Sequence, residues 1–180
     1  MADHEHKEGE ECFMCSIPGS LEQKMEGLDA KVMENMDKYG IHIVGVHGSS
    51  EEPTFAYSVG MFKLGQPEVI ILGMPFQTAM FFINDVFAEV EAGKAFADGE
   101  VIPEFAQGRD AKPLGLAFKA VSDAVADEYV RVALNTVKKH GGSWHGLLQM
   151  VWPDRQNRFP WDPEYDHHFD KYQPKLWQLG

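Results

Sequence analysis

The sequence has 180 residues, of which 44% are hydrophobic and 12% aromatic, and its 28 acidic and 16 basic residues give a formal net charge of −12. This length and composition are typical of one globular domain with a sizeable core rather than of a disordered chain. An acidic protein repels polyphosphates, so nucleic acid is not an expected partner. No apolar stretch has the length of a signal peptide or a membrane span, and we expect a cytoplasmic protein that does not bind membranes.

The N-terminal part of the chain differs in composition from the rest. Residues 1–19 are predicted to form an acidic tail and a loop that contains Cys12 and Cys15. Residues 20–180 are predicted to form a single α+β domain with a C-terminal segment that wraps around it. The first helix of this domain is predicted over residues 20–39, where apolar residues recur at helical spacing.

Segments rich in β-branched and aromatic residues follow this helix. Three of them are predicted strands, namely Ile41–His47, Thr54–Met61 and Glu68–Gly73. Because their connectors are short, we expect antiparallel neighbours. A second helix is predicted to begin near Pro75 and to end at Gly93.

The second half of the chain alternates between clear and interrupted patterns. Residues 94–113 contain two glycines and two prolines, so no long element is predicted there. The elements predicted next are a strand at Leu114–Val121, a helix at Ser122–His140 and a strand at Trp144–Trp152. Together the patterns predict an α+β fold in which a mainly antiparallel sheet of about five strands packs with about three helices.

Cys12 and Cys15 are the two cysteines of the chain. Two thiolates at this spacing can bind one tetrahedral metal ion, zinc or iron, which would need further ligands. The histidines that are candidates for these ligands are His47 and His145, with His4, His6 and His42 as others. The same spacing also suits a redox-active dithiol, and a structural or incidental pair is the third interpretation. A disulfide framework is not expected in a reduced compartment.

The stretch from Gln149 to Trp161 gathers aromatic and charged residues after a predicted strand. In one interpretation it forms an aromatic clasp that locks the C-terminal segment onto the core. In the other, Trp152 and Trp161 are the walls of a cleft and Asp154 is a polar anchor within it. The pattern favours the clasp.

Several segments in the same order carry a family resemblance. They are the Cys12–Cys15 pair, Pro53–Met61, Pro67–Val69, Gln149–Asp154 and Phe159–Trp161. In these segments the chain resembles the uncharacterised bacterial domain-of-unknown-function family 4262, over most of its length. The resemblance implies a shared fold, and it brings no assigned reaction.

These segments also suggest where a ligand would bind. Tyr57 as a proton donor, and Glu68 or Asp154 as a base or anchor, would line a pocket with Trp152 and Trp161. Alternatively, Glu68 and Asp154 only stabilise turns. Three functions stay open: a metal-supported binding or regulatory domain, an enzyme that acts on a small molecule, and a thiol redox sensor. The partner would be an unidentified small molecule or protein.

Overall fold

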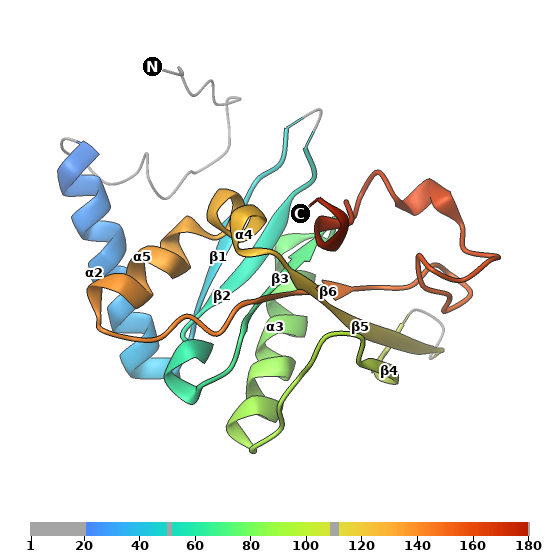
Figure 1. Cartoon of the computed structure of the whole chain (residues 1–180), viewed down its shortest axis with the longest axis horizontal. Helices are drawn as coiled ribbons and strands as arrows, with labels where there is room; N and C mark the ends of the chain where they lie inside the picture. Colours follow the sequence, from blue (N-terminus) through green and yellow to red (C-terminus); the bar gives the residue numbers. More distant parts are fainter. Residues whose placement is uncertain (1–20, 50–51, 109–111, 180) are drawn as a thin grey trace.

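The fold is a six-stranded sheet with helices on both of its faces, seen in a computed structural model that describes residues 21–49, 52–108 and 112–179 (Figure 1). The strands are β1 (His42–Val46), β2 (Phe55–Val59), β3 (Glu68–Leu72), β4 (Val101–Gln107), β5 (Pro113–Val121) and β6 (Leu147–Val151). The α-helices are α2 (Leu21–Tyr39), α3 (Phe76–Glu91), α4 (Asp123–Tyr129) and α5 (Arg131–Lys139). Short 3-10 helices are η1 (Met61–Leu64), η3 (His167–Phe169) and η4 (Leu176–Gln178).

The order of strands in the sheet is β1-β2-β3-β6-β5-β4. Four neighbouring pairs are antiparallel, but the central pair of β3 and β6 is parallel. The prediction of an α+β fold is confirmed, whereas the sheet is mixed and has one strand more than predicted. The parallel pair arises because α3 and the β4–β5 hairpin lie between β3 and β6 in the chain, and this long connection returns β6 in the direction of β3.

The additional strand is β4, which the sequence pattern did not predict. It lies at the edge of the sheet, where the missing N–H of Pro103 breaks no inner ladder. The pairing of β4 with β5 also shifts its register between Ile102 and Ala106, so that β4 contains extra residues there. Such a bulge hides the regular alternation by which a strand is recognised.

The third predicted helix, Ser122–His140, is interrupted. Val130 has φ −120° and ψ 40°, which separates α4 from α5, and its side chain is fully buried. Because the chain bends at this residue, both short helices direct apolar side chains at the same face of the sheet.

Two apolar layers enclose the sheet. Alternate residues along β3 point to opposite faces, so that Val69 and Ile71 pack with α3, whereas Ile70 and Leu72 pack with α2, α4 and α5. The C-terminal segment, defined as residues 152–179, then runs back over the molecule (Figure 1, orange to dark red). Its last turn, η4, buries Leu176 in the layer of α2, α4 and α5.

Candidate functional site

Asp154 is the centre of a tight turn that follows β6. Its Oδ1 atom accepts hydrogen bonds from the backbone N–H groups of Gln156, at 2.8 Å, and Arg158, at 3.0 Å. Its Oδ2 atom accepts from the backbone N–H of Asp166, at 3.0 Å, and from the guanidinium of Arg158, at 2.9 Å. Burial alone would raise the pKa of Asp154, but these hydrogen bonds together outweigh it and lower the pKa. The carboxylate is therefore a stable anion that organises its own loop.

Gln149 and Gln173 attach the C-terminal segment to the end of the sheet. The Gln149 amide donates to the Pro174 carbonyl and accepts from the Leu176 N–H, both at 2.9 Å. The Gln173 amide accepts from the N–H of Trp152, at 3.2 Å, and donates to its carbonyl, at 2.6 Å. Both glutamine side chains are fully buried.

Trp152 and Trp161 pack on opposite faces of the sheet. The indole N–H of Trp152 donates to the carbonyl of Leu72 at 2.8 Å, and its ring packs against the core layer under α3. Trp161 instead stacks on Phe159, whose ring belongs to the cluster on the other face, with 5.1 Å between ring centroids. The ammonium of Lys119 lies 4.8 Å from the centre of the Trp161 ring. The two tryptophans are thus not opposite walls of one cleft.

Glu68 lies at the far end of β3 from Trp152 and Asp154. Its carboxylate is buried and accepts hydrogen bonds from the hydroxyl of Ser58 and from the N–H groups of Gly60, at 2.9 Å, and Phe62, at 3.1 Å. Burial raises the pKa of Glu68, and these hydrogen bonds offset only part of that effect. The group holds η1 against the start of β3.

Tyr57 is buried in the layer of α2, α4 and α5, with 2% of its surface exposed. Burial raises the pKa of its hydroxyl, which is hydrogen-bonded to the backbone of Val132. Because Glu68 begins β3 and Asp154 follows the end of the parallel strand β6, the structure places these two carboxylates beyond opposite ends of the sheet.

Only some of the proposed metal ligands belong to the described residues. Cys12 and Cys15 lie outside the described residues. His47 follows the end of β1 and His145 precedes the start of β6, two strands that run in the same direction. The two imidazoles therefore lie beyond opposite ends of the sheet and are not placed to bind the same ion. In residues 21–49, 52–108 and 112–179, no three His, Cys, Asp or Glu side chains gather as metal ligands would.

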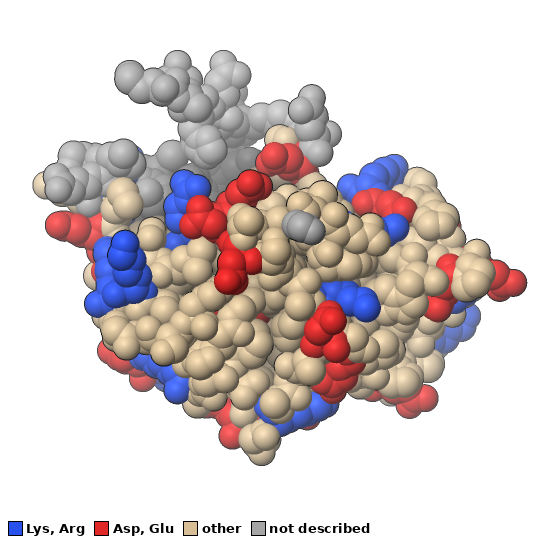
Figure 2. Space-filling model, viewed as in Figure 1, with Lys and Arg blue, Asp and Glu red and all other residues tan. Residues whose placement is uncertain are grey.

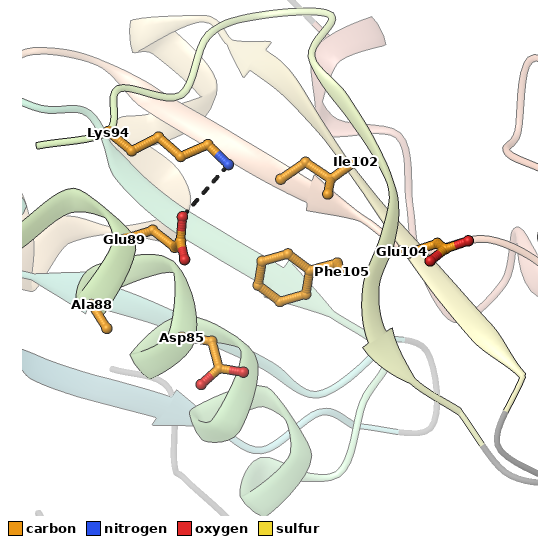
Figure 3. A pocket seen from close by; sticks show the side chains of 7 residues that line it. All are labelled: Asp85, Ala88, Glu89, Lys94, Ile102, Glu104 and Phe105. Carbon is orange, nitrogen blue, oxygen red and sulfur yellow. Dashed lines mark ion pairs between the residues drawn. The ribbon is translucent and has the colours of Figure 1, made fainter. Parts of the chain in front are cut away.

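A hollow of about 290 Å³ lies between α3 and the edge strand β4, and none of the sequence-predicted site residues lines it (Figure 3). Its lining consists of Asp85, Ala88, Glu89, Lys94, Ile102, Glu104 and Phe105. The Phe105 ring is fixed by stacking on Phe82, with 5.7 Å between centroids. The ammonium of Lys94 lies 3.8 Å from a carboxylate oxygen of Glu89. The hollow therefore combines an apolar floor with charged walls.

Asp85 and Glu89 both project from α3 into this hollow (Figure 3). Burial, and secondly the negative charge of Glu89, raise the pKa of Asp85. The sequence contains one indication of this hollow, since Asp85 and Glu89 stand four residues apart on a helix most of whose other residues are apolar. The partner strand was not predicted, so the hollow was missed.

A second hollow, of about 420 Å³, continues along β4. It is lined by Glu104, Phe105, Ala106, Gln107 and Pro113, and it shares Glu104 and Phe105 with the first. We call the two together the α3–β4 groove. The β4 residues that line the two hollows are Ile102, Glu104, Phe105, Ala106 and Gln107.

Charged side chains do not gather into one patch of a single sign on the face seen in Figure 2. On the face that Figure 2 shows, acidic and basic side chains are scattered among uncharged ones. No helix in the described part of the chain combines the length and the apolar character that a membrane span requires.

The fold is that of a small α+β domain with a mixed sheet, and its surface is hollowed between α3 and β4. The chain belongs to the family of the domain of unknown function DUF4262, whose sequence pattern matches residues 35–166. This match confirms the resemblance seen in the sequence. Neither the curated proteins nor the solved structures contain a match to the chain.

Proposed function

We propose that this member of the family is a binding or regulatory domain and that the α3–β4 groove is its ligand site. The observation that carries the proposal is the composition of the groove: a fixed aromatic ring, Phe105, lies beside the carboxylates of Asp85 and Glu89 on an open surface. Binding sites typically combine such an apolar surface with a few polar groups that orient the ligand.

Buried polar residues elsewhere in the chain support the same view. Asp154, Gln149 and Gln173 use their hydrogen-bonding groups on the backbone of the C-terminal segment, and Glu68 does so at the start of β3. Groups occupied in this way maintain the fold. In the groove, by contrast, Glu89 pairs with Lys94 at 3.8 Å, and within the described residues no ion pair involves Asp85.

The proposal is tested by mapping where small molecules bind to the labelled full-length protein. A fragment library with cationic, neutral and anionic members is added, and backbone amide shifts are followed by NMR. We expect the shifted residues to cluster at Asp85, Glu89 and Phe105. If they cluster at Tyr57, Asp154 and Trp161 instead, the enzyme alternative is favoured and this proposal is wrong.

The metal-supported form of the proposal rests on the spacing of Cys12 and Cys15, which suits one zinc or iron ion. Elemental analysis of the untagged protein, purified under reducing conditions, tests it. About one metal ion per chain, lost in a Cys12→Ser/Cys15→Ser variant, is the expected result. A content near zero in the unaltered protein contradicts it, and a titration of both thiols against a glutathione couple then tests the redox-sensor alternative.

A further inference from the structure

The two edge strands of the sheet, β1 and β4, differ in how they are protected against pairing with another chain (Figure 1). The strand β4 contains Pro103, Glu104 and a shift of register, three features that discourage such pairing. The strand β1 has none of them: its register with β2 is continuous, and residues 40–48 include no Asp, Glu, Lys or Arg. None of its residues is fully buried. The edge at β1 is therefore suited to pairing with a further strand.

The hydrogen bonds of the inner strands show which backbone groups of β1 face outward. The N–H of Gly73 donates to the carbonyl of Thr54 at 2.8 Å, so the even-numbered residues of β2 direct their backbone groups at β3. The odd-numbered residues of β2 therefore face β1, where they lie opposite its residues 42, 44 and 46. The N–H and C=O groups of Ile43 and Gly45 then point away from the sheet, and no other described segment pairs with them.

This outward edge is complementary to itself. When two copies of β1 pair antiparallel with Val44 opposite Val44, Ile43 of each copy lies opposite Gly45 of the other. Each such pair exchanges both of its backbone hydrogen bonds, and a large side chain meets a residue without one. The Phe76 ring lies over Gly45, so close that a Cβ atom there would overlap it, and it belongs to the same apolar layer as Ile43. Ile43 of the second copy would therefore pack beside this ring.

The distribution of charge is compatible with a second copy at this edge. The chain has a formal net charge of −12, so two copies repel each other unless the surfaces that meet are uncharged. Residues 40–48 form such a surface. In the antiparallel arrangement His42 lies opposite Val46, so the imidazoles of the two copies do not face each other. A charged partner segment, by contrast, would find no complementary charge on β1.

We propose that two copies of this protein associate through β1, which pairs antiparallel with β1 of the second copy and joins the two sheets into one. Val44 lies at the two-fold axis, and the contacts of Ile43 with Phe76 of the second copy form the apolar side of the interface. The α3–β4 groove lies at the other edge of each sheet, so both copies keep it open. The inference goes beyond the proposed function and does not depend on it.

The first test measures mass and backbone exchange in the unaltered full-length protein. Size-exclusion chromatography with light scattering covers about 5 µM to about 500 µM, because a small interface dissociates on dilution. At the upper end we expect twice the 20.3 kDa of one chain. Amide hydrogen exchange, followed by NMR, locates the interface: the N–H groups of Ile43 and Gly45 should exchange at least about tenfold more slowly in the dimer than in the monomer.

The second test uses variants at the two-fold axis. Val44→Lys and Val44→Glu should each abolish association, because like charges directly opposite each other destabilise a strand pair. An equimolar mixture of the two variants should associate again, since the lysine then lies opposite the glutamate. Val101→Lys is the matched control: it adds the same charge at an exposed position of β4 and should leave the mass unchanged. Thermal unfolding shows whether each variant is folded.

The mass of one chain at every concentration contradicts the proposal. Association that persists in both Val44 variants means that another surface is used, and a mixture that stays monomeric while the unaltered protein associates rules out the proposed register. Slow exchange at Ile43 and Gly45 in the monomer means that the chain itself covers this edge, which equally overturns the inference. If a variant is unfolded, the exchange measurement on the unaltered protein decides.

Discussion

Gln149 and Gln173 make a reciprocal exchange of side-chain hydrogen bonds, in which each binds the backbone near the other residue, at the junction between β6 and the C-terminal segment. The Gln149 side chain binds backbone groups of Pro174 and Leu176, which follow Gln173, while the Gln173 side chain binds both backbone groups of Trp152, which follows β6. Each side-chain amide thus serves as both donor and acceptor, as the backbone of a neighbouring strand would. Because the four backbone partners lie beside buried side chains, this exchange fixes the position of the C-terminal segment.

The replacement Gln149→Leu should destabilise the protein by roughly 1–3 kcal/mol, because it removes the buried side-chain partner of the Pro174 carbonyl and of the Leu176 N–H, which keep only their 3.1 Å bond to each other. Urea unfolding measures the change. Gln178→Leu, at an exposed position in η4, is the control and should alter the free energy of unfolding by less than about 0.5 kcal/mol. In combination with Gln173→Leu the effects should be less than additive, since both residues hold one segment. Full additivity would contradict the shared role.

The replacement Asp154→Asn should cost about 2–4 kcal/mol, because an amide group would turn N–H donors toward the donors of Arg158 and Asp166. Glu164→Gln is the matched control, since Glu164 contacts the same guanidinium but is 84% exposed in its side chain. Its effect should be small. Equal effects of the two replacements in chemical denaturation would show that Asp154 does not organise the turn.

The contribution of Asp154 should also depend on pH. The pKa of Asp154 is lowered in the folded protein, so its stabilising effect is complete above the unfolded value of about 3.9 and disappears as the pH falls through the folded value. The difference in unfolding free energy between the unaltered protein and Asp154→Asn should therefore shrink below about pH 4. A difference that stays constant down to pH 2 would be inconsistent with a lowered pKa.

Glu68 should show the opposite dependence. Burial raises its pKa in the folded protein, so the stability of the unaltered protein relative to Glu68→Gln is greatest below the unfolded value of about 4.3 and declines as the pH rises through the raised value. Glu68→Ala should be less stable than Glu68→Gln at every pH, because it leaves the N–H groups of Gly60 and Phe62 without an acceptor. Denaturation series at pH 4 and pH 8 test both statements.

The replacement Gly73→Ala should detach the C-terminal segment. Gly73 has φ +75°, and a methyl group there would overlap the carbonyl of Tyr172. Gly141 has a similar φ of +68° but open space around it, so Gly141→Ala measures the backbone strain alone, about 1–2 kcal/mol. A larger loss in Gly73→Ala, with faster proteolysis of residues 152–179, is the expected result. Equal losses would mean that the close approach to Tyr172 is unimportant.

Local pattern identified most of the elements. The helices α2 and α3 and the strands β1, β2, β3, β5 and β6 correspond to predicted segments with shifted ends. Helical and alternating spacing can be recognised in the sequence because it reflects which face of the helix or strand is buried. The strand β4 was not predicted because its bulge disturbs that alternation. The break at Val130 was not predicted because helical spacing continues on both sides of it.

The residues singled out in the sequence were brought together only in part. Trp152 and Asp154 are neighbours in the chain and both serve the C-terminal segment, but Glu68 lies at the other end of the sheet and Tyr57 lies in the core. The distance between these residues depends on the parallel pairing of β3 with β6. A single sequence does not encode strand order locally, because pairing is decided by the burial of both faces of the whole sheet.

The sequence by itself determined the class of the fold, the family and the acidic character. These follow from composition, from local periodicity and from the order of short motifs along the chain, none of which requires knowledge of contacts. The exchange between Gln149 and Gln173 and the α3–β4 groove were decided only by the tertiary structure. In both cases the partners are far apart in the chain or belong to an irregular edge strand, and only packing places Phe105 opposite Asp85.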